Sequence, residues 1–200
     1  MEEQQEARSY TVERKTAETD VHLVLTLDGE GKAAVDTGVP FLDHMLTLFA
    51  VHGFIDLAIA AKGDIEVDDH HTVEDVGICL GQAFSGALGD KSGIKRYGSC
   101  LLPMDEALVR VVADLSNRPF LHFDVPMADQ KIGTFDSALG KEFLRAFSLH
   151  AGVTLHVDLL HGENGHHILE AVFKGLGRTI SEACAMSERS NGVLSSKGCL

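Results

Sequence analysis

Alternation of apolar and polar residues identifies the candidate strands of the chain. From Val21 to Leu27 every second residue is apolar, which is the pattern of a half-buried strand. The segment Asp28-Gly29-Glu30-Gly31 after it is typical of a turn. Later in the chain, Asn117-Arg118-Pro119 gives a similar turn signal, and a further strand is predicted from Phe120 to Val125. These segments predict strands that each turn one face toward a core.

Apolar residues at helical spacing predict two short and two long helices. The short helices cover residues 42–51 and 143–149, and the long amphipathic ones cover residues 71–88 and 167–186. Residues 189–200 contain Gly, Ser and Asn with little periodicity, so we expect a loop or a flexible end there. Strands followed by helices, twice over, are typical of an α+β protein.

The two long helices open with the same motif, which indicates an internal duplication. The motif reads His70-His71-Thr72-Val73-Glu74 in the first helix and His166-His167-Ile168-Leu169-Glu170 in the second, and a Leu-Gly pair follows each copy at the same distance. Two weaker similarities flank the motif in the same order. Residues 18–27 resemble residues 106–115, and residues 44–52 resemble residues 142–150.

We therefore expect an α+β fold built from two similar halves. Each half is predicted to hold a sheet of about four strands with two helices packed on one face, as in ferredoxin-like or split βαβ folds. The first half covers residues 1–93, the second covers residues 94–187, and residues 188–200 form a C-terminal tail. The chain has 200 residues, of which 44% are hydrophobic, so a core large enough for both halves to pack as one unit is expected.

Composition disfavours several classes of protein. A net charge of −13 disfavours nucleic-acid binding, and no apolar run approaches the roughly 20 residues of a membrane helix. The four scattered cysteines disfavour a zinc ribbon, a thioredoxin motif and a disulfide scaffold. The acidic, polar segment at residues 1–6 is the reverse of a secretory signal. We expect a cytoplasmic protein, or an organellar one whose targeting segment has been removed.

The histidine pairs of the repeated motif have the spacing of metal ligands. In a helix, Glu74 lies on the same face as His70 and close to His71, because residues three and four apart are neighbours. Adjacent residues diverge by about 100° around the helix axis, so the two histidines of a pair are expected to serve different ions. The second half repeats this arrangement with His166, His167 and Glu170.

Four imidazoles and two carboxylates divide naturally into two similar metal sites. Mixed nitrogen and oxygen ligands suit Mn²⁺, Fe²⁺ or Zn²⁺, and octahedral sites with carboxylates favour manganese. His44 and its counterpart Glu142 are candidate additional ligands. A single histidine pair at a helix start is more often a cap or a surface feature, but its repetition with the glutamate favours metal binding. Among the other histidines, surface or strand positions are expected for His22, His122 and His161, and the role of His52, His150 and His156 stays open.

A second group of residues is basic, in an otherwise acidic chain. It consists of Arg96, Arg118, Lys174 and the segment Ser195-Ser196-Lys197. Arginine forks and lysine charges are the groups that a phosphate ester requires. Each residue taken singly is more often a solvated charge, and spacing alone does not bring the group together.

Longer motifs of the chain occur together, and in the same order, in one known family. They are Thr16-Ala17-Glu18-Thr19, residues 36–45 (Asp-Thr-Gly-Val-Pro-Phe-Leu-Asp-His-Met), residues 69–75 (Asp-His-His-Thr-Val-Glu-Asp), Arg96-Tyr97-Gly98, residues 103–107 (Pro-Met-Asp-Glu-Ala), Gly165-His166-His167 and Ser195-Ser196-Lys197-Gly198. Together they resemble imidazoleglycerol-phosphate dehydratase. The resemblance extends from about residue 8 to residue 198.

The resemblance implies an activity, a cofactor and an assembly. The reaction would be dehydration of D-erythro-imidazole glycerol phosphate to imidazole acetol phosphate in histidine biosynthesis. It would pass through a metal-bound imidazolate and a diazafulvene-like intermediate, with two Mn²⁺ ions acting as Lewis acids. The partners would be this small phosphate ester and further copies of the chain, in a 24-subunit assembly with active sites between subunits.

The resemblance also implies residue roles. One ion would take His44, one histidine of each pair and Glu74, and the other would take the remaining histidines, Glu170 and Glu142. Glu18 and Glu170 are the acid/base candidates, and Asp105 would hold substrate hydroxyls. The substrate phosphate would be bound by Arg96, Arg118, Lys174, Ser195 and Lys197, which would help to hold the reacting carbons in place.

Two positions depart from the family pattern. Residue 142 is histidine in many members and glutamate here, a ligand that can still bind manganese. Leu48 stands where a glutamine often contributes to substrate contact, so one polar contact near the phosphate would be absent or supplied elsewhere.

Two other classes of protein could use the same ligands. A metal-storage or metal-sensing protein would bind metal without a reaction, but it gives no role to Glu18, Asp105 and the basic group. A two-metal hydrolase of phosphate esters is the nearest enzymatic alternative. It would usually be richer in aspartate ligands and would place the phosphate on the metals.

Overall fold

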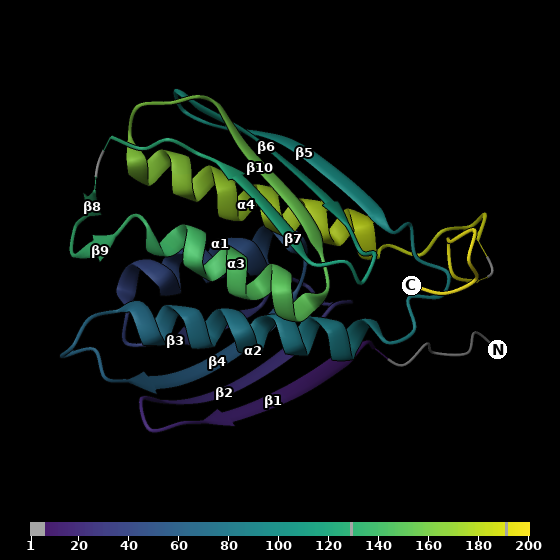
Figure 1. The fold of residues 1–200 in the computed structure, drawn as a ribbon, viewed down its shortest axis with the longest axis horizontal. Coiled ribbons are helices and arrows are strands. Elements are labelled where there is room, and N and C mark those ends of the chain that lie inside the picture. Colours follow the sequence, from purple (N-terminus) through teal and green to yellow (C-terminus); the bar gives the residue numbers. More distant parts are fainter. Residues whose placement is uncertain (1–6, 129, 191) are drawn as a thin grey trace.

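The computed structural model describes residues 7–128, 130–190 and 192–200 of the chain. Among these residues, four helices form a layer between two four-stranded sheets (Figure 1). The acidic segment at residues 1–6 lies outside the described residues. No helix in the described ranges is both long and apolar enough to cross a bilayer.

The two halves of the chain have the same order of elements. The first half contributes β1 (Ser9–Lys15), β2 (Thr19–Thr26), β3 (Ala33–Asp36), α1 (Pro40–Gly53), β4 (Asp56–Gly63) and α2 (His70–Leu88). The second contributes β5 (Tyr97–Met104), β6 (Ala107–Asp114), β7 (Phe120–Asp124), α3 (Leu139–Ala151), β10 (Thr154–His161) and α4 (Gly165–Cys184). A small hairpin, β8 (Lys131–Ile132) with β9 (Phe135–Asp136), is inserted only in the second half.

The sheets confirm the predicted α+β class and the duplication. Their strand orders, β1-β2-β4-β3 and β5-β6-β10-β7, correspond position by position. In each sheet the last pair of strands is parallel and the other pairs are antiparallel. The four expected helices are present, and each differs from its predicted bounds by a few residues at most.

The expected split βαβ arrangement is wrong in one particular. In a split unit, another strand lies between the two parallel strands. Here β3 and β4 pair directly, as do β7 and β10. The reason is that β2 pairs with the free edge of β4 on the side away from β3, so it does not enter between the parallel strands.

Alternating burial along the strands places the core between each sheet and the helices. On β2, Val21, Leu23 and Leu25 are buried, whereas Asp20 and His22 on the opposite face are exposed. Burying one such aliphatic side chain contributes about 1.5–3 kcal/mol. The buried apolar residues of both halves belong to one hydrophobic cluster.

Two helix pairs, each drawn from both halves, build the middle layer. Helix α1 packs on α4, and α2 packs on α3. The glycine of the repeated Leu-Gly pair lies at both crossings. A Cβ on Gly177 would meet the Phe49 carbonyl oxygen of α1 at 2.4 Å, and one on Gly81 would meet the Phe147 carbonyl oxygen of α3 at 2.8 Å. The repeated glycines therefore allow a close backbone approach that sets each helix of one half against a helix of the other.

Candidate metal and active site

A side-chain oxygen just before each helix binds the backbone of its histidine pair, that of the N-cap Asn164 at α4 and that of Asp68, which precedes the N-cap, at α2. The backbone N–H of His166 donates to Asn164 Oδ1 at 2.9 Å, and that of His70 donates to Asp68 Oδ1 at 2.8 Å. Such bonds satisfy N–H groups that a helix start leaves without a partner. The adjacent histidines then diverge, with interplanar angles of 88° in the first pair and 82° in the second.

Three predicted ligands from the two halves meet where α1 crosses α4. Nε2 of His44 lies 3.4 Å from Glu170 Oε2, and Nε2 of His166 lies 3.2 Å from the same oxygen. We call these residues the His44 group. Each can offer one ligand atom, with all three atoms within 4.8 Å of one another. The group therefore has the donors and the spacing of a partial metal site.

Lys174 controls the charge of the carboxylate in the His44 group. Glu170 is buried, which by itself raises the pKa of its carboxyl. The Lys174 ammonium donates to Oε1 at 2.5 Å, and His44 adds a smaller contribution, so the net effect is a pKa below the usual range. Glu170 is therefore ionised at neutral pH, as a metal ligand must be.

A corresponding group lies where α2 crosses α3. We call His70, Glu74 and Glu142 the Glu142 group. Nε2 of His70 lies 3.8 Å from Glu74 Oε2. The Arg145 guanidinium lies between the two carboxylates, 3.3 Å from Glu74 Oε1 and 2.7 Å from Glu142 Oε2. Glu142 thus takes the place in this half-site that His44 takes in the other.

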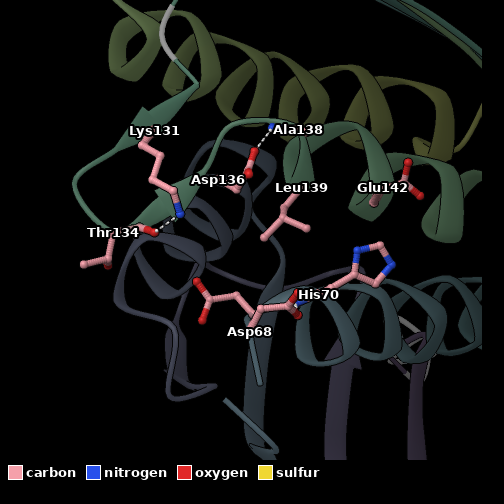
Figure 2. Close-up of a pocket in the computed structure, with 9 residues that line it drawn as sticks. Asp68, His70, Lys131, Thr134, Asp136, Ala138, Leu139 and Glu142 are labelled. Atoms are coloured by element: carbon pink, nitrogen blue, oxygen red, sulfur yellow. Dashed lines mark hydrogen bonds between the residues drawn. The ribbon is translucent and has the colours of Figure 1, made fainter. Parts of the chain in front are cut away.

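The Glu142 group borders a cavity of about 570 Å³. Figure 2 shows His70 and Glu142 facing each other across it, from the helix ribbons of α2 and α3. The rest of the lining is mostly polar and comes from the start of α2 and the hairpin region: Asp68, Asp69, Lys131, Thr134, Asp136, Ala138 and Leu139. Burial raises the pKa of Asp69, and the charge of Asp68 adds to this. The cavity gives a polar ligand access to one of the two groups.

The geometry within the chain divides the ligands differently from the division that the resemblance implied. His44 lies beside Glu170 and not beside Glu74, and Glu142 is linked through Arg145 to Glu74. The reason is the helix pairing, because α1 packs on α4 and α3 packs on α2.

The second histidine of each pair is held by a different set of carboxylates. Nδ1 of His71 lies 3.1 Å from Asp64, and Nδ1 of His167 lies 2.7 Å from Glu106. The same imidazoles place Nε2 3.8 Å from Glu18 and Asp105 respectively. A carboxylate on Nδ1 fixes the tautomer and leaves Nε2 as the ligand atom, which is the usual support of a metal-binding histidine.

These contacts shift the pKa values of the groups involved. The hydrogen bond that His71 donates to Asp64 raises the pKa of His71, and the one that His167 donates to Glu106 raises the pKa of His167. In return, His167 lowers the pKa of Glu106 to about 2. Glu18 and Asp105 lie in the turns that follow the first strand of each sheet, and Asp105 has a positive φ of 48°. The structure thus brings Glu18 and Asp105, both predicted site residues, to His71 and His167. We call His71 and His167 the outward histidines.

The predicted phosphate ligands fall into two separate places in the chain. Asp114 accepts from Arg96 at 2.7 Å and from Arg118 at 3.4 Å, and Arg96 also donates to the Leu194 carbonyl oxygen at 2.6 Å. Ser195 and Lys197 follow directly in that tail, where the Lys197 N–H donates to Ser195 Oγ. Arg96 is buried and has a φ of +73°, an unusual backbone state for a non-glycine residue.

Lys174 lies at the other end of β5 from these arginines. It contacts the sulfur of Met104 at the end of that strand, whereas Arg96 precedes its start. Eight strand residues span roughly 25 Å, so one small phosphate cannot bridge both places within a chain.

Leu48 stands where a polar contact to the substrate was expected to be absent or supplied elsewhere. Its side chain is partly buried and packs against the hydrophobic core.

Three residues with evident roles were not among the predicted site residues. Asp64 and Glu106 orient the outward histidines, and Arg145 links the carboxylates of the Glu142 group. Arg145 could have been found, because it lies three residues after Glu142 on a predicted helix. Asp64 lies in the connection from β4 to α2, and its role depends on how that connection folds back onto the helix start. Glu106 reaches His167 from the turn between β5 and β6, which no local pattern in the sequence encodes.

A comparison with known protein families gives a match over most of the chain. The sequence model of imidazoleglycerol-phosphate dehydratase matches residues 37–180. Imidazoleglycerol-phosphate dehydratase of Desulfotalea psychrophila is 63% identical over 193 residues, covering 96% of each protein. That of Syntrophobacter fumaroxidans is 58% identical over 193 residues, covering 96% of this chain and 98% of the relative.

Solved structures agree with the fold. The crystal structure of imidazoleglycerol-phosphate dehydratase from Staphylococcus aureus matches with a TM-score of 0.82 at 41% identity, covering 90% of this chain and 99% of that one. The structure of the Pyrococcus furiosus enzyme in complex with (S)-C348 matches with a TM-score of 0.83 at 40% identity, covering 94% and 100%.

Proposed function

The chain belongs to the imidazoleglycerol-phosphate dehydratase family, and we propose that it removes water from imidazole glycerol phosphate at two metal ions held by its repeated histidine groups. The product is imidazole acetol phosphate, and the reaction belongs to histidine biosynthesis. The observation that carries the proposed site is the pair of corresponding ligand groups, one at each crossing between helices of the two halves.

The donor atoms suit divalent manganese. The His44 group offers two imidazoles and one carboxylate, and the Glu142 group offers one imidazole and two carboxylates. Neither group contains a cysteine, and burial raises the pKa of Cys79 to about 11 and of Cys184 to about 12, so these two thiols stay protonated at neutral pH. Nitrogen and carboxylate donors in octahedral sites favour Mn²⁺ over softer or tetrahedral ions. When bound, the two ions would polarise the imidazole ring of the substrate as Lewis acids.

Each group is incomplete within one chain, which supports a site shared between subunits. Three donor side chains leave several positions of an octahedral ion unfilled. His71 and His167 are the predicted ligands left over, and their carboxylate partners direct Nε2 away from Asp64 and Glu106. We infer that they complete the groups of neighbouring copies in a homo-oligomer, the 24-subunit assembly implied by the family resemblance.

The carboxylates near the outward histidines supply the proton chemistry. Glu18 lies 3.8 Å from Nε2 of His71, so its carboxylate would face a substrate held at an ion on that nitrogen. A proton on the substrate carbon or hydroxyl would then be within its reach. Asp105 lies equally close to Nε2 of His167 and would accept hydrogen bonds from substrate hydroxyls. Glu170, kept ionised by Lys174, can act as a ligand or base.

The basic group would hold the substrate phosphate. Asp114 accepts from both Arg96 and Arg118, and Arg96 contacts the tail at Leu194, next to Ser195. Lys174 would join them only from another subunit, since it lies at the far end of β5 in the same chain. A phosphate subsite made by two chains agrees with metal sites made by two chains.

The family match disfavours the two alternative activities, metal storage and hydrolysis of a phosphate ester. Metal storage and phosphate-ester hydrolysis are not the activity for which this family is named.

We also infer a cytoplasmic location. Its support is that all four cysteines are free, as thiols are in a reducing compartment.

The proposal is tested by adding Mn²⁺ to metal-stripped protein in the presence of imidazole glycerol phosphate. Imidazole acetol phosphate should form only after the metal is added. His71→Ala and His167→Ala should each lose manganese and disturb assembly, whereas His22→Ala, on an exposed strand position, should behave as the wild type. No metal-dependent product, or normal manganese content in both ligand variants, would refute the assignment.

A further inference from the structure

The outer face of the second sheet carries another cluster of metal-ligating side chains, away from the helix crossings. His122 and Asp124 are two residues apart on β7, so their side chains share one face of the sheet. His156 and Asp158 have the same spacing on β10. The two strands pair in parallel register, with His156 opposite His122 and Asp158 opposite Asp124. Two histidines thus lie beside two aspartates on paired strands.

The distances in this cluster are those of a site that needs only small rotations to close. His122, Asp124 and Asp158 can each offer a ligand atom, all within 4.8 Å of one another. Nε2 of His122 lies 3.4 Å from Asp158 Oδ1. The His122 and His156 rings lie 5.3 Å apart between centroids. Ligand atoms about 2.0–2.2 Å from an ion lie roughly 3–3.5 Å from one another, so His122, Asp124 and Asp158 are close to that arrangement already, and His156 would join them by rotation of its side chain.

Asp158 is oriented as a ligand by a residue outside the cluster. Nε of Arg110, on the neighbouring strand β6, donates to Asp158 Oδ2 at 3.2 Å. The other oxygen, Oδ1, faces His122. The Asp158 side chain is only 16% exposed, so its position is set by these contacts. A carboxylate with one oxygen anchored and one presented is typical of supported metal ligands.

Charge also favours a cation here. Asp124 and Asp158 lie directly opposite each other on paired strands, an arrangement that is destabilising for like charges. The Arg110 guanidinium offsets only one of the two negative charges. A bound cation would therefore relieve the remaining repulsion between the two carboxylates.

The first sheet shows that the cluster does not follow from the duplication. Its outer face has Ala58 and Ala60 exposed on β4, the strand that corresponds to β10. His22 on β2 has Glu13 at 3.8 Å as its acidic neighbour. The His–Asp cluster is thus a feature of the second half alone.

We propose that His122, Asp124 and Asp158, with His156 as a fourth ligand, bind one divalent transition-metal ion. Two imidazoles and two carboxylates suit a tetrahedral ion, for which Zn²⁺ is the best match. The ion would join β7, the edge strand of its sheet, to β10 and so stabilise that edge. The site is separate from the dehydratase residues and uses none of them.

The test counts metal in the assembled enzyme. Manganese-loaded protein is dialysed against a low, fixed concentration of Zn²⁺, and bound zinc and manganese are measured by mass spectrometry. Wild type should hold one more zinc per chain than His122→Ala or Asp158→Asn. His22→Ala is the matched control, an exposed strand histidine without a second histidine beside it, and it should hold as much zinc as wild type.

Dehydratase activity with Mn²⁺ shows that each variant is folded and should be unchanged. His156→Ala is a further variant, and it should lower the affinity for the additional zinc. Equal zinc content in wild type, His122→Ala and Asp158→Asn would overturn the proposal. So would an equal loss of zinc in His22→Ala, because the binding would then not depend on the cluster.

Discussion

Substitution of Gly177 by alanine should misplace the His44 group without unfolding the protein. The added Cβ would lie 2.4 Å from the Phe49 carbonyl oxygen, whereas ordinary contacts begin at 3.4 Å. Helices α1 and α4 must therefore separate by about 1 Å, because a backbone oxygen cannot rotate away as a side chain can. His44 is on α1 and Glu170 is on α4, so the same movement widens their 3.4 Å approach.

The free energy of unfolding and kcat/KM of Gly177→Ala should change to different extents. Overpacking typically costs 1–3 kcal/mol, and replacing glycine by alanine in a helix returns about 1 kcal/mol. The net loss in the free energy of unfolding should be at most about 2 kcal/mol. A misplacement of about 1 Å can lower catalysis about 100-fold, so kcat/KM should fall much more than stability requires.

The assay compares Gly177→Ala with Gly175→Ala on the same helix. A Cβ on Gly175 would meet a methyl group of Val111 at 2.9 Å, which involves the sheet and not α1. Urea unfolding, manganese content and kcat/KM are measured for both variants. Wild-type manganese affinity and kcat/KM in Gly177→Ala would refute the reasoning, and an equal loss in Gly175→Ala would show that general core strain is responsible.

Three further predictions concern other parts of the molecule. Glu106→Gln and Asp64→Asn should each weaken manganese binding about 10–100-fold in equilibrium dialysis, because the outward histidine loses its orienting carboxylate; unchanged affinity in both would contradict that role. Arg8 lowers the pKa of Asp28 through a hydrogen bond. The pair therefore stabilises the fold above the pKa of Asp28 in the unfolded chain, about 3.9. This stabilisation is lost as the pH falls through the lower pKa of the folded protein. Asp28→Asn should therefore flatten the stability profile below about pH 4 in urea titrations, and an unchanged slope would argue against the coupling. Phe143→Ala, at a fully buried position between α2 and α4 residues, should lower the free energy of unfolding by about 3–5 kcal/mol, and a loss below about 1 kcal/mol would contradict its place in the core.

Local patterns predicted the four helices, the strands β2 and β7, and the duplication, because these depend on residues close in sequence. The spacing of apolar residues located all four helices, and the repeated His-His-x-x-Glu motif located the start of α2 and α4. The strand order was less accessible. Whether β3 and β4 are neighbours depends on where β2 pairs, and this is decided by packing between distant segments.

The sequence indicated candidate ligands, but not which of them lie together in the folded chain. Helical geometry correctly separated the two histidines of each pair, as the different partners of His70 and His71 demonstrate. Which helix faces which depends on the close crossings at Gly81 and Gly177, and the sequence showed these glycines only as part of a repeat. The supporting carboxylate Glu106 comes from a turn that approaches α4 only in the folded chain, whereas Asp64 lies in the connection that leads into α2.

The central claim is that an outward histidine of one chain completes a ligand group of another. Mixing inactive variants tests this claim most directly. His44→Ala is mixed with His71→Ala in one sample and with His167→Ala in another, each without metal, and Mn²⁺ is then added. At least one mixture should regain dehydratase activity, because hybrid oligomers contain sites in which both contributions are intact. A mixture of His44→Ala and Glu170→Gln, which both damage the same group, should stay inactive. Failure of both complementing mixtures to regain any activity, although hybrid oligomers form, would contradict the shared site.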